Sequence, residues 1–304
     1  MTDEEKVIST QDSIAPSETL HEITDKVMIN KASYSKTKMF TLAIAAGAFI
    51  AFGAMVSLTV KTGNTCGWGL TQLIGALTFA TGLIMVVLTG AELFTGNVMM
   101  TFSVLEKEVK ISELLRSWGV VYLGNFIGSI LVVGLVFGAH MGLNGGGEVG
   151  VTAMQTSFAK INLTWGEAFF RGILCNWLVC LAVFMATTSK RVIGKIFAIF
   201  FPIMTFVASG YEHSVANMFF LPNGIMMKHF SSIVAASGMT PDQLATMTWK
   251  GFFINNLIPV TIGNIIGAFL FFVLIFWTAY LREEHRHDHH HVHHHFHQTK
   301  IKNN

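Results

Sequence analysis

Ionisable side chains stand inside apolar stretches of this sequence at Glu92, Glu212 and His213, and a glycine precedes each glutamate by two residues. Imidazole can donate a hydrogen bond or a proton near neutral pH, and a carboxylate can accept either one. His213 therefore has the chemistry to protonate or hydrogen-bond a small anion. The alternative is a buried histidine that bonds to a backbone carbonyl.

The two glutamates allow two interpretations. As proton relays they would exchange protons with a passing group, and as structural residues they would accept N–H groups that helix ends leave without partners. We favour the structural interpretation for Glu92 and Glu212, because a break in the helix is expected beside each of them. Thr95 is open as well: its hydroxyl either caps a short helix that begins near Gly96 or faces a permeating anion across from His213.

Residue patterns typical of enzymes do not accompany these groups. No HExxH or GxSxG pattern occurs in an apolar stretch, and His213 is the only histidine placed deep within one. Cys66, Cys175 and Cys180 have no metal-binding or redox spacing. We therefore predict a protein that is not an enzyme and that has no cofactor and no metal, with an intramembrane enzyme as the alternative. A receptor or scaffold would not need ionisable groups at this depth.

The composition indicates that lipid is the main solvent of the chain. Of its 304 residues, 52% are hydrophobic and 12% charged, and the mean hydropathy is +0.53. The formal net charge is +2, and the basic residues are scattered. Scattered charge gives no basic patch for a polyanion, so no nucleic-acid partner is expected. The chain is predicted to lie in a lipid bilayer.

Six apolar stretches are long enough to cross a bilayer, which takes about 20 helical residues at about 1.5 Å each. They lie at 39–60, 70–104, 118–139, 167–187, 196–227 and 253–281. Basic residues are concentrated before the first stretch and after the second, fourth and sixth. By the positive-inside rule, both termini are expected in the cytoplasm. The predicted localisation is multi-pass in the cell membrane, inner or plasma.

The second and fifth stretches are too long for one crossing, and each is interrupted near its middle by the glycine and glutamate described above. An asparagine follows each glutamate by five residues, and Gly124-Asn125 in the third stretch recurs as Gly263-Asn264 in the sixth. The predicted fold is an all-α membrane protein with six transmembrane helices in an inverted 3+3 repeat, with helices 2 and 5 broken. Half-helix N-termini at the midplane would favour an anion there.

Three regions follow from these boundaries. Residues 1–35 carry many acidic residues and no apolar core, so they are predicted to be a cytoplasmic tail, followed by the transmembrane channel domain at 36–282. Residues 283–304 form a histidine-rich cytoplasmic tail that could bind zinc or nickel weakly, although disorder is the simpler interpretation. Asn162 begins a glycosylation sequon.

Three segments, residues 90–97, 207–219 and 256–264, resemble the formate/nitrite transporter family, closest to its formate-channel branch. The resemblance covers residues 30–283. It implies an aquaporin-like protomer in a homopentamer, with one pore in each protomer and no catalytic turnover.

The resemblance also implies roles for individual residues, several of which would otherwise be ordinary packing residues or, for the lysine, a solvated side chain. The implied substrate pore has His213, Thr95, Asn176 and Asn217, and the implied vestibule has Lys160. The implied constrictions are Leu83, Leu93 and Phe94 on the cytoplasmic side and Phe79, Val179 and Phe206 on the outer side. Family members often have histidines just after the vestibule lysine, whereas this chain has residues 161–163, Ile-Asn-Leu.

The predicted function is therefore a channel or transporter for formate and similar small monovalent anions, with proton-coupled permeation through the central His213. Nitrite, hydrosulfide, lactate and acetate are rival substrates within the same fold. Flux measurements are needed to identify the preferred anion and to distinguish a channel from a symporter.

Overall fold

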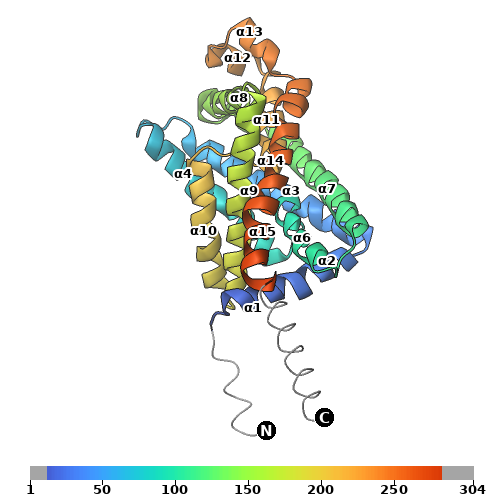
Figure 1. Ribbon diagram of the computed structural model, residues 1–304. Coiled ribbons are helices and arrows are strands. Elements are labelled where there is room, and N and C mark those ends of the chain that lie inside the picture. The colour runs from blue at the N-terminus through green and yellow to red at the C-terminus, as the bar shows by residue number, and fades with distance from the viewer. Residues whose placement is uncertain (1–11, 283–304) are drawn as a thin grey trace, which may run out of the picture.

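The computed structural model describes residues 12–282, and this part of the chain is helical (Figure 1). In chain order the helices are α1 Pro16–His21, η2 Glu22–Val27, α2 Met28–Ser33, α3 Lys36–Lys61, α4 Trp68–Thr89, α5 Phe94–Asn97, η3 Val98–Met100, α6 Thr101–Leu105, α7 Ile111–Gly138, η4 Met141–Gly147, α8 Glu148–Ile161, α9 Trp165–Thr188, α10 Val192–Ala208, α11 Ser214–Met227, α12 Ser231–Ser237, α13 Pro241–Thr246, η5 Gly251–Leu257, α14 Ile258–Ala268, η6 Phe269–Val273, α15 Leu274–Phe276 and η7 Trp277–Leu281. The all-α prediction is confirmed.

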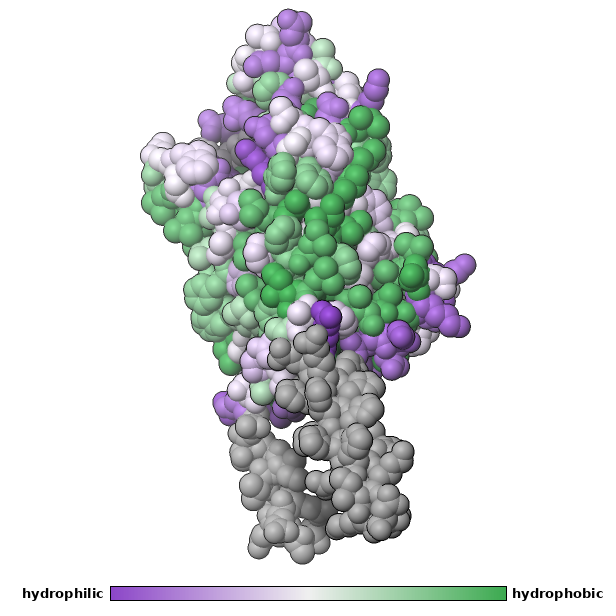
Figure 2. Space-filling model, in the orientation of Figure 1, coloured by the Kyte–Doolittle hydropathy of each residue, from purple (hydrophilic) through white to green (hydrophobic). Residues whose placement is uncertain are grey.

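Five helices among the described residues are long and apolar enough to cross a membrane: α3, α4, α7, α9 and the continuous run Gly251–Leu281. Two shorter apolar helices, Phe94–Leu105 and Val192–Ala208, lie between them in the chain. The face shown in Figure 2 carries a broad apolar band between two polar ends. That distribution matches a protein that is surrounded by hydrocarbon at its middle and by water at its ends.

The long helices begin before the apolar stretches that predicted them. The third stretch was expected to start at residue 118, but α7 starts at Ile111. The carboxylate of Glu113 accepts the backbone N–H of Lys110 at 2.9 Å, and this contact fixes the start of the helix outside the apolar core. At α9 the cap is reciprocal, because Glu167 accepts the Thr164 N–H at 2.8 Å and the Thr164 hydroxyl oxygen accepts the Glu167 N–H at 3.2 Å. Hydropathy locates the part of a helix that lies in lipid, whereas capping residues determine where the helix begins.

Two sets of three helices pack in the same way. α3 lies against α4 and α7, and α9 lies against α10 and α14. Glycines allow the close approach: a Cβ on Gly128 of α7 would overlap the Ile44 carbonyl oxygen of α3, and a Cβ on Gly267 of α14 would overlap the Ile173 carbonyl oxygen of α9. Small residues at crossings are the usual way in which membrane helices pack without a hydrophobic driving force between them.

The segment before the first long helix is part of the packed structure. Residues 16–33 are helical in α1, η2 and α2, and Leu20, Ile23 and Met28 are buried against α6, α9 and the last helix. We expected residues 1–35 to form a tail, and its described part is a folded helical segment at one end of the bundle (Figure 1). The histidine-rich run lies outside the described residues.

Candidate functional site

Two interruptions of the helical chain define the centre of the molecule. α4 ends at Thr89 and α5 begins at Phe94, while α10 ends at Ala208 and α11 begins at Ser214. Gly90 has φ +69° and Gly210 has φ +74°. A side chain disfavours this left-handed backbone, so glycine is the residue suited to end each helix there.

Asn125 and Asn264 hold the two interruptions in matching ways. Asn125 Oδ1 accepts the Phe94 N–H at 2.9 Å, and Asn264 Oδ1 accepts the Ser214 N–H at 2.9 Å. Each Nδ2 donates to two carbonyl oxygens, one of them in an interruption: Asn125 to Glu92, and Asn264 to Glu212, at 2.8 and 2.9 Å. The second carbonyl lies in α3 for Asn125 and in α9 for Asn264. These amides satisfy backbone groups that the helix ends would leave unpaired.

Both glutamates are buried ion-pair partners. Glu212 accepts from Lys160 Nζ at 2.6 Å and from Asn217 Nδ2 at 2.6 Å. In the other half, Glu92 is 2.9 Å from Lys31 Nζ and accepts from Asn97 at 2.7 Å. The carboxylates thus take these hydrogen bonds from side chains, and not from the backbone N–H groups that we expected. A buried carboxylate needs such a cation, because an unpaired charge in an apolar interior is costly.

The imidazole of His213 lies between the two interruptions. Its Nδ1 accepts the backbone N–H of Ala216 at 3.0 Å and thereby caps α11. Its Nε2 lies 3.0 Å from the hydroxyl oxygen of Thr95. Because Nδ1 is an acceptor, a neutral ring carries its hydrogen on Nε2 and donates it to Thr95. Thr95 is the second residue of α5 and does not cap that helix, which excludes the first of its two interpretations.

A cavity of about 350 Å³ leads to this imidazole from the end of the molecule that carries α8. The side chains of its wall that bear on its chemistry are Lys61, Lys160, Arg171, Glu212, His213 and Asn217. Three of these side chains are cationic and one is a carboxylate. A cavity with this balance of charge attracts anions.

Aromatic rings close the cavity near His213. Phe79 and Phe206 both line it, and their ring centroids are 5.9 Å apart in an edge-on arrangement. The Phe206 ring lies nearly parallel to the imidazole, with the centroids 6.0 Å apart. The third residue of the implied outer constriction, Val179, is buried outside the cavity lining.

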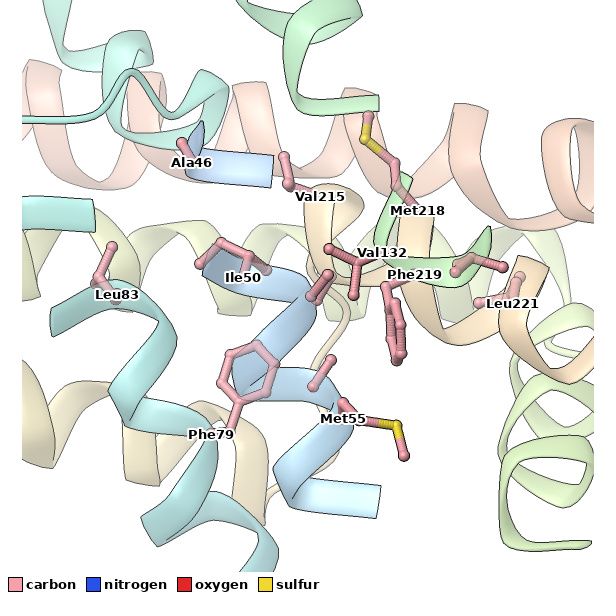
Figure 3. Packing of buried hydrophobic residues seen from close by; sticks show 14 of the residues in the cluster. Ala46, Ile50, Met55, Phe79, Leu83, Val132, Val215, Met218, Phe219 and Leu221 are labelled. Carbon is pink, nitrogen blue, oxygen red and sulfur yellow. The ribbon is translucent and has the colours of Figure 1, made fainter. Parts of the chain in front are cut away.

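Two residues of the implied cytoplasmic constriction adjoin Thr95, and the third lies on α4. Leu93 and Phe94 directly precede Thr95 in the chain, and both are buried. Leu83 is buried on α4 and belongs to the same cluster of buried hydrophobic side chains as Ile50 of α3 (Figure 3). The Phe94 ring packs edge-on against Tyr122 of α7, with the centroids 4.9 Å apart.

Three buried polar atoms without a partner within residues 12–282 belong to residues of α11 and α9 that adjoin His213 or Thr95. Among the described residues, Asn176 Oδ1, Asn217 Oδ1 and Ser214 Oγ have no hydrogen-bond partner. The amide nitrogen of Asn176 is occupied, because it donates to the backbone oxygen of Thr95 at 3.1 Å. Native proteins leave few buried polar atoms unpaired, so this group is suited to bind water or a small polar solute.

Comparison with known proteins decides the family. A family model described as formate/nitrite transporter matches residues 17–278. The chain belongs to the formate/nitrite transporter family. The resemblance found in residues 90–97, 207–219 and 256–264 is thereby confirmed, and with its apolar helices this family member is a multi-pass membrane protein.

Individual relatives of this transporter-family chain are similar over most of their length. It is 41% identical over 246 residues to a Haemophilus influenzae protein named formate channel FocA, covering 79% of this chain and 87% of the relative. It is 38% identical over 264 residues to the Escherichia coli protein of the same name, covering 86% and 93%. A solved structure described as "Pentameric formate channel with formate bound" superposes with a TM-score of 0.74 at 41% identity, covering 81% of this chain and 98% of that one.

Three cations of the site were missed by reasoning from the sequence. Lys31, Lys61 and Arg171 were used only to count charges in loops, yet Lys31 pairs with Glu92 and the other two line the cavity. A signal was present for Lys31, because a buried glutamate in each half requires a cation; Lys160 was expected in the vestibule and not as the partner of Glu212. Asn125 and Asn264 were recognised as a repeated pattern, but their role in capping was not.

Proposed function

We propose that this protein is a channel for formate and similar small monovalent anions, with no enzymatic activity. The observation that carries the proposal is the cationic cavity that leads to the Nε2 of His213. The names of the most similar relatives, and the similarity to a solved formate channel with formate bound, support formate as the substrate. A pore that ends at a hydrogen-bond donor suits a carboxylate, which offers two acceptor oxygens.

The proposed architecture has six membrane crossings in an inverted 3+3 repeat, as in an aquaporin-like protomer. In this arrangement α4 with α5–α6, and α10 with α11, are the second and fifth crossings, each interrupted at its middle. The matching contacts of Asn125 and Asn264 support the repeat. We further propose a homopentamer, on the similarity to the pentameric solved structure, with both termini in the cytoplasm.

The proposed pore has two apolar constrictions with His213 and Thr95 between them. Phe79 and Phe206, with Val179 of the next layer, narrow the outer side, and the inner set is Leu83, Leu93 and Phe94. A bare carboxylate that enters such a passage loses its hydration at a cost of many kcal/mol, whereas neutral formic acid avoids most of that cost. Net passage through both constrictions therefore favours the acid over the anion.

Protonation is proposed to occur at His213. When formate accepts the Nε2–H in place of Thr95, its charge stabilises a cationic ring. The ring then takes a solvent proton on Nδ1, which releases the Ala216 N–H, and Nε2 passes its hydrogen to formate. The products are formic acid and a neutral ring protonated on Nδ1, and return of the hydrogen to Nε2 restores the cap. Releasing one capping hydrogen bond costs about 1 kcal/mol, which is small beside the desolvation of an anion.

The unpartnered polar atoms fit both forms of the substrate. The O–H of formic acid would donate to Asn217 Oδ1, which lines the cavity and has no partner among the described residues. The hydroxyl of Ser214 would donate to a substrate oxygen. Asn176 lies one layer away and would keep the Thr95 backbone in place through its bond to the carbonyl oxygen.

The experiment that tests this function is uptake into proteoliposomes. Formate, nitrite, hydrosulfide, lactate and acetate are offered separately, with and without an inward proton gradient. We expect formate uptake to exceed lactate and acetate uptake and to rise when the outside is acidic. If nitrite or hydrosulfide enters faster than formate, the substrate assignment is wrong, and if none of the anions enters above empty liposomes, the channel function is wrong.

A further inference from the structure

Lys61, the last residue of α3, lines the cavity, and contacts with α4 fix the position of its side chain. Its aliphatic stem crosses Gly75, where a Cβ would overlap the lysine Cε. Its ammonium donates to Gln72 Oε1 at 2.6 Å. Lys61, Gln72 and Lys160 all line the cavity that ends at His213. The side chain is therefore held in one position at the cavity wall.

Among the described residues, Lys61 has no carboxylate as an ion-pair partner. The ammonium of Lys160 is already paired with Glu212 at 2.6 Å, and the two side chains are only 18% and 3% exposed. Arg171 also lines the cavity, with its guanidinium 3.5 Å from the Gly210 carbonyl oxygen. Between residues 12 and 282, no ion pair involves Lys61 or Arg171. Arg171 also interacts with the carboxylate of Glu167, one turn before it on α9, so the attraction for an incoming anion comes chiefly from Lys61.

We propose that Lys61, and not the ion-paired Lys160, is the capture site for the permeating anion in this cavity. The inference rests on the proposed function. The ligand is a small monovalent anion, which would accept a charge-assisted hydrogen bond from Nζ while Gln72 holds the lysine in place. Lys160 then serves mainly to neutralise Glu212 beside the imidazole.

A structural role is the competing explanation, because the hydrogen bond between Lys61 and Gln72 also links α3 to α4. The two explanations differ in what restores function. A structural link depends on the hydrogen bond, whereas a capture site depends on positive charge at the cavity wall. Capture also affects transport at low substrate concentration, and has little effect once the anion is saturating.

The first arm of the test measures formate uptake as a function of concentration in proteoliposomes at low ionic strength. Lys61→Gln should raise the half-saturating formate concentration about threefold to tenfold, the order expected for loss of one partly screened charge, with maximal flux within about twofold of wild type. Lys61→Arg should restore the wild-type value. Lys250→Gln is the matched control, because Lys250 is exposed beyond α13 and lies outside the cavity lining.

The second arm varies the charge in one folded preparation. In a Cys66→Ser background, which removes the exposed native thiol, Lys61→Cys is treated with a cationic, a neutral or an anionic thiol reagent. The cationic reagent should lower the half-saturating concentration toward wild type, and the anionic one should raise it further. Equal effects of the three reagents, or an unchanged value in Lys61→Gln, would overturn the capture site. Failure of the wild type to take up formate would instead overturn the proposed function.

Discussion

The Phe206 ring lies next to the imidazole and contacts the Phe79 ring, and the proposed function assigns to this pair the selection of what reaches His213. Phe79 and Phe206 meet edge-on, and Phe206 also lies alongside the His213 ring. Both side chains are buried, so truncating them opens space within the passage and leaves the outer surface unchanged. A rigid apolar ring selects a solute by its size and by the cost of removing its water.

Phe79→Ala combined with Phe206→Ala should therefore admit larger monocarboxylates. We expect lactate flux to rise relative to formate flux by about tenfold or more, because the wider passage no longer excludes the extra carbons. Parallel uptake of both labelled acids into liposomes measures the ratio. Phe170→Ala with Phe201→Ala, two exposed rings on the neighbouring helices α9 and α10, is the control and should leave the ratio unchanged. An unchanged ratio in the Phe79 and Phe206 variant would mean that these rings do not line the pore.

The sequence identified single residues best where the residue type itself was unusual. A histidine in an apolar stretch was recognisable as a candidate site, and the structure places its Nε2 3.0 Å from the hydroxyl oxygen of Thr95. Partners from distant segments were not recognisable. Lys31 and Glu92 are far apart in the chain, and nothing in either local sequence indicates that the folded N-terminal segment brings them within 2.9 Å.

The helices depend on backbone contacts that only glycine permits. Gly128 and Gly267 occupy matching places at the crossings of α7 with α3 and of α14 with α9, and at each a Cβ would overlap a carbonyl oxygen of the partner helix. Backbone atoms cannot rotate away as a flexible side chain does. An added methyl group would have to push α7 away from α3, or α14 away from α9. These displacements would move Asn125 on α7 or Asn264 on α14.

Gly128→Ala and Gly267→Ala should each destabilise the protein by about 2 kcal/mol or more, as overpacking of a tight interior does. Gly134→Ala is the matched control on α7, because a Cβ there meets no atom within 4 Å, and it should be neutral or slightly stabilising. Thermal unfolding in detergent compares the three variants. Equal midpoints for Gly128→Ala and Gly134→Ala would show that the close crossing is not needed.

Element types were predictable, whereas element ends were only partly so. Hydropathy located the long helices, and the glycines beside Glu92 and Glu212 correctly marked where α4 and α10 stop. The starts of α7 and α9 were placed too late, because Glu113 and Glu167 extend those helices into polar sequence by capping. The helices in residues 16–33 escaped notice because short amphipathic turns in an acidic segment resemble a solvated tail.

The whole molecule has two chemically different ends. Helices α8, α12 and α13 lie at one end, where α8 contributes Lys160 to the cationic cavity, and α1 and α2 lie at the other (Figure 1). Basic loops adjoin the second end, where Arg191 pairs with Asp12 at 2.7 Å. By the positive-inside rule we propose that this end faces the cytoplasm, so that the cavity would open to the outside.

This orientation predicts which thiols a membrane-impermeant maleimide reaches in intact cells. Native Cys66 is exposed in the turn between α3 and α4 and should be labelled from outside. Lys190→Cys in a Cys66→Ser background places a thiol in the turn between α9 and α10, and it should be labelled only after the cells are made permeable. The reverse pattern would invert the assigned orientation.

Proton coupling through His213 is the central claim, and one substitution separates it from positioning alone. His213→Asn keeps an oxygen that can cap α11 at the Ala216 N–H and a nitrogen that can donate toward Thr95, but it has no group that titrates. The variant should therefore fold and still bind the anion. It should lose the step in which a solvent proton is passed to formate.

The most direct measurement records labelled formate influx and membrane current together, for wild type and His213→Asn, at several outside pH values. In the wild type, influx should rise as the outside pH falls, with about one proton for each formate and little current. In His213→Asn the pH-dependent, electroneutral influx should be lost, and any remaining flux should carry current. If the variant keeps the same pH-dependent, electroneutral influx, His213 is a structural cap and the proposed proton relay is wrong.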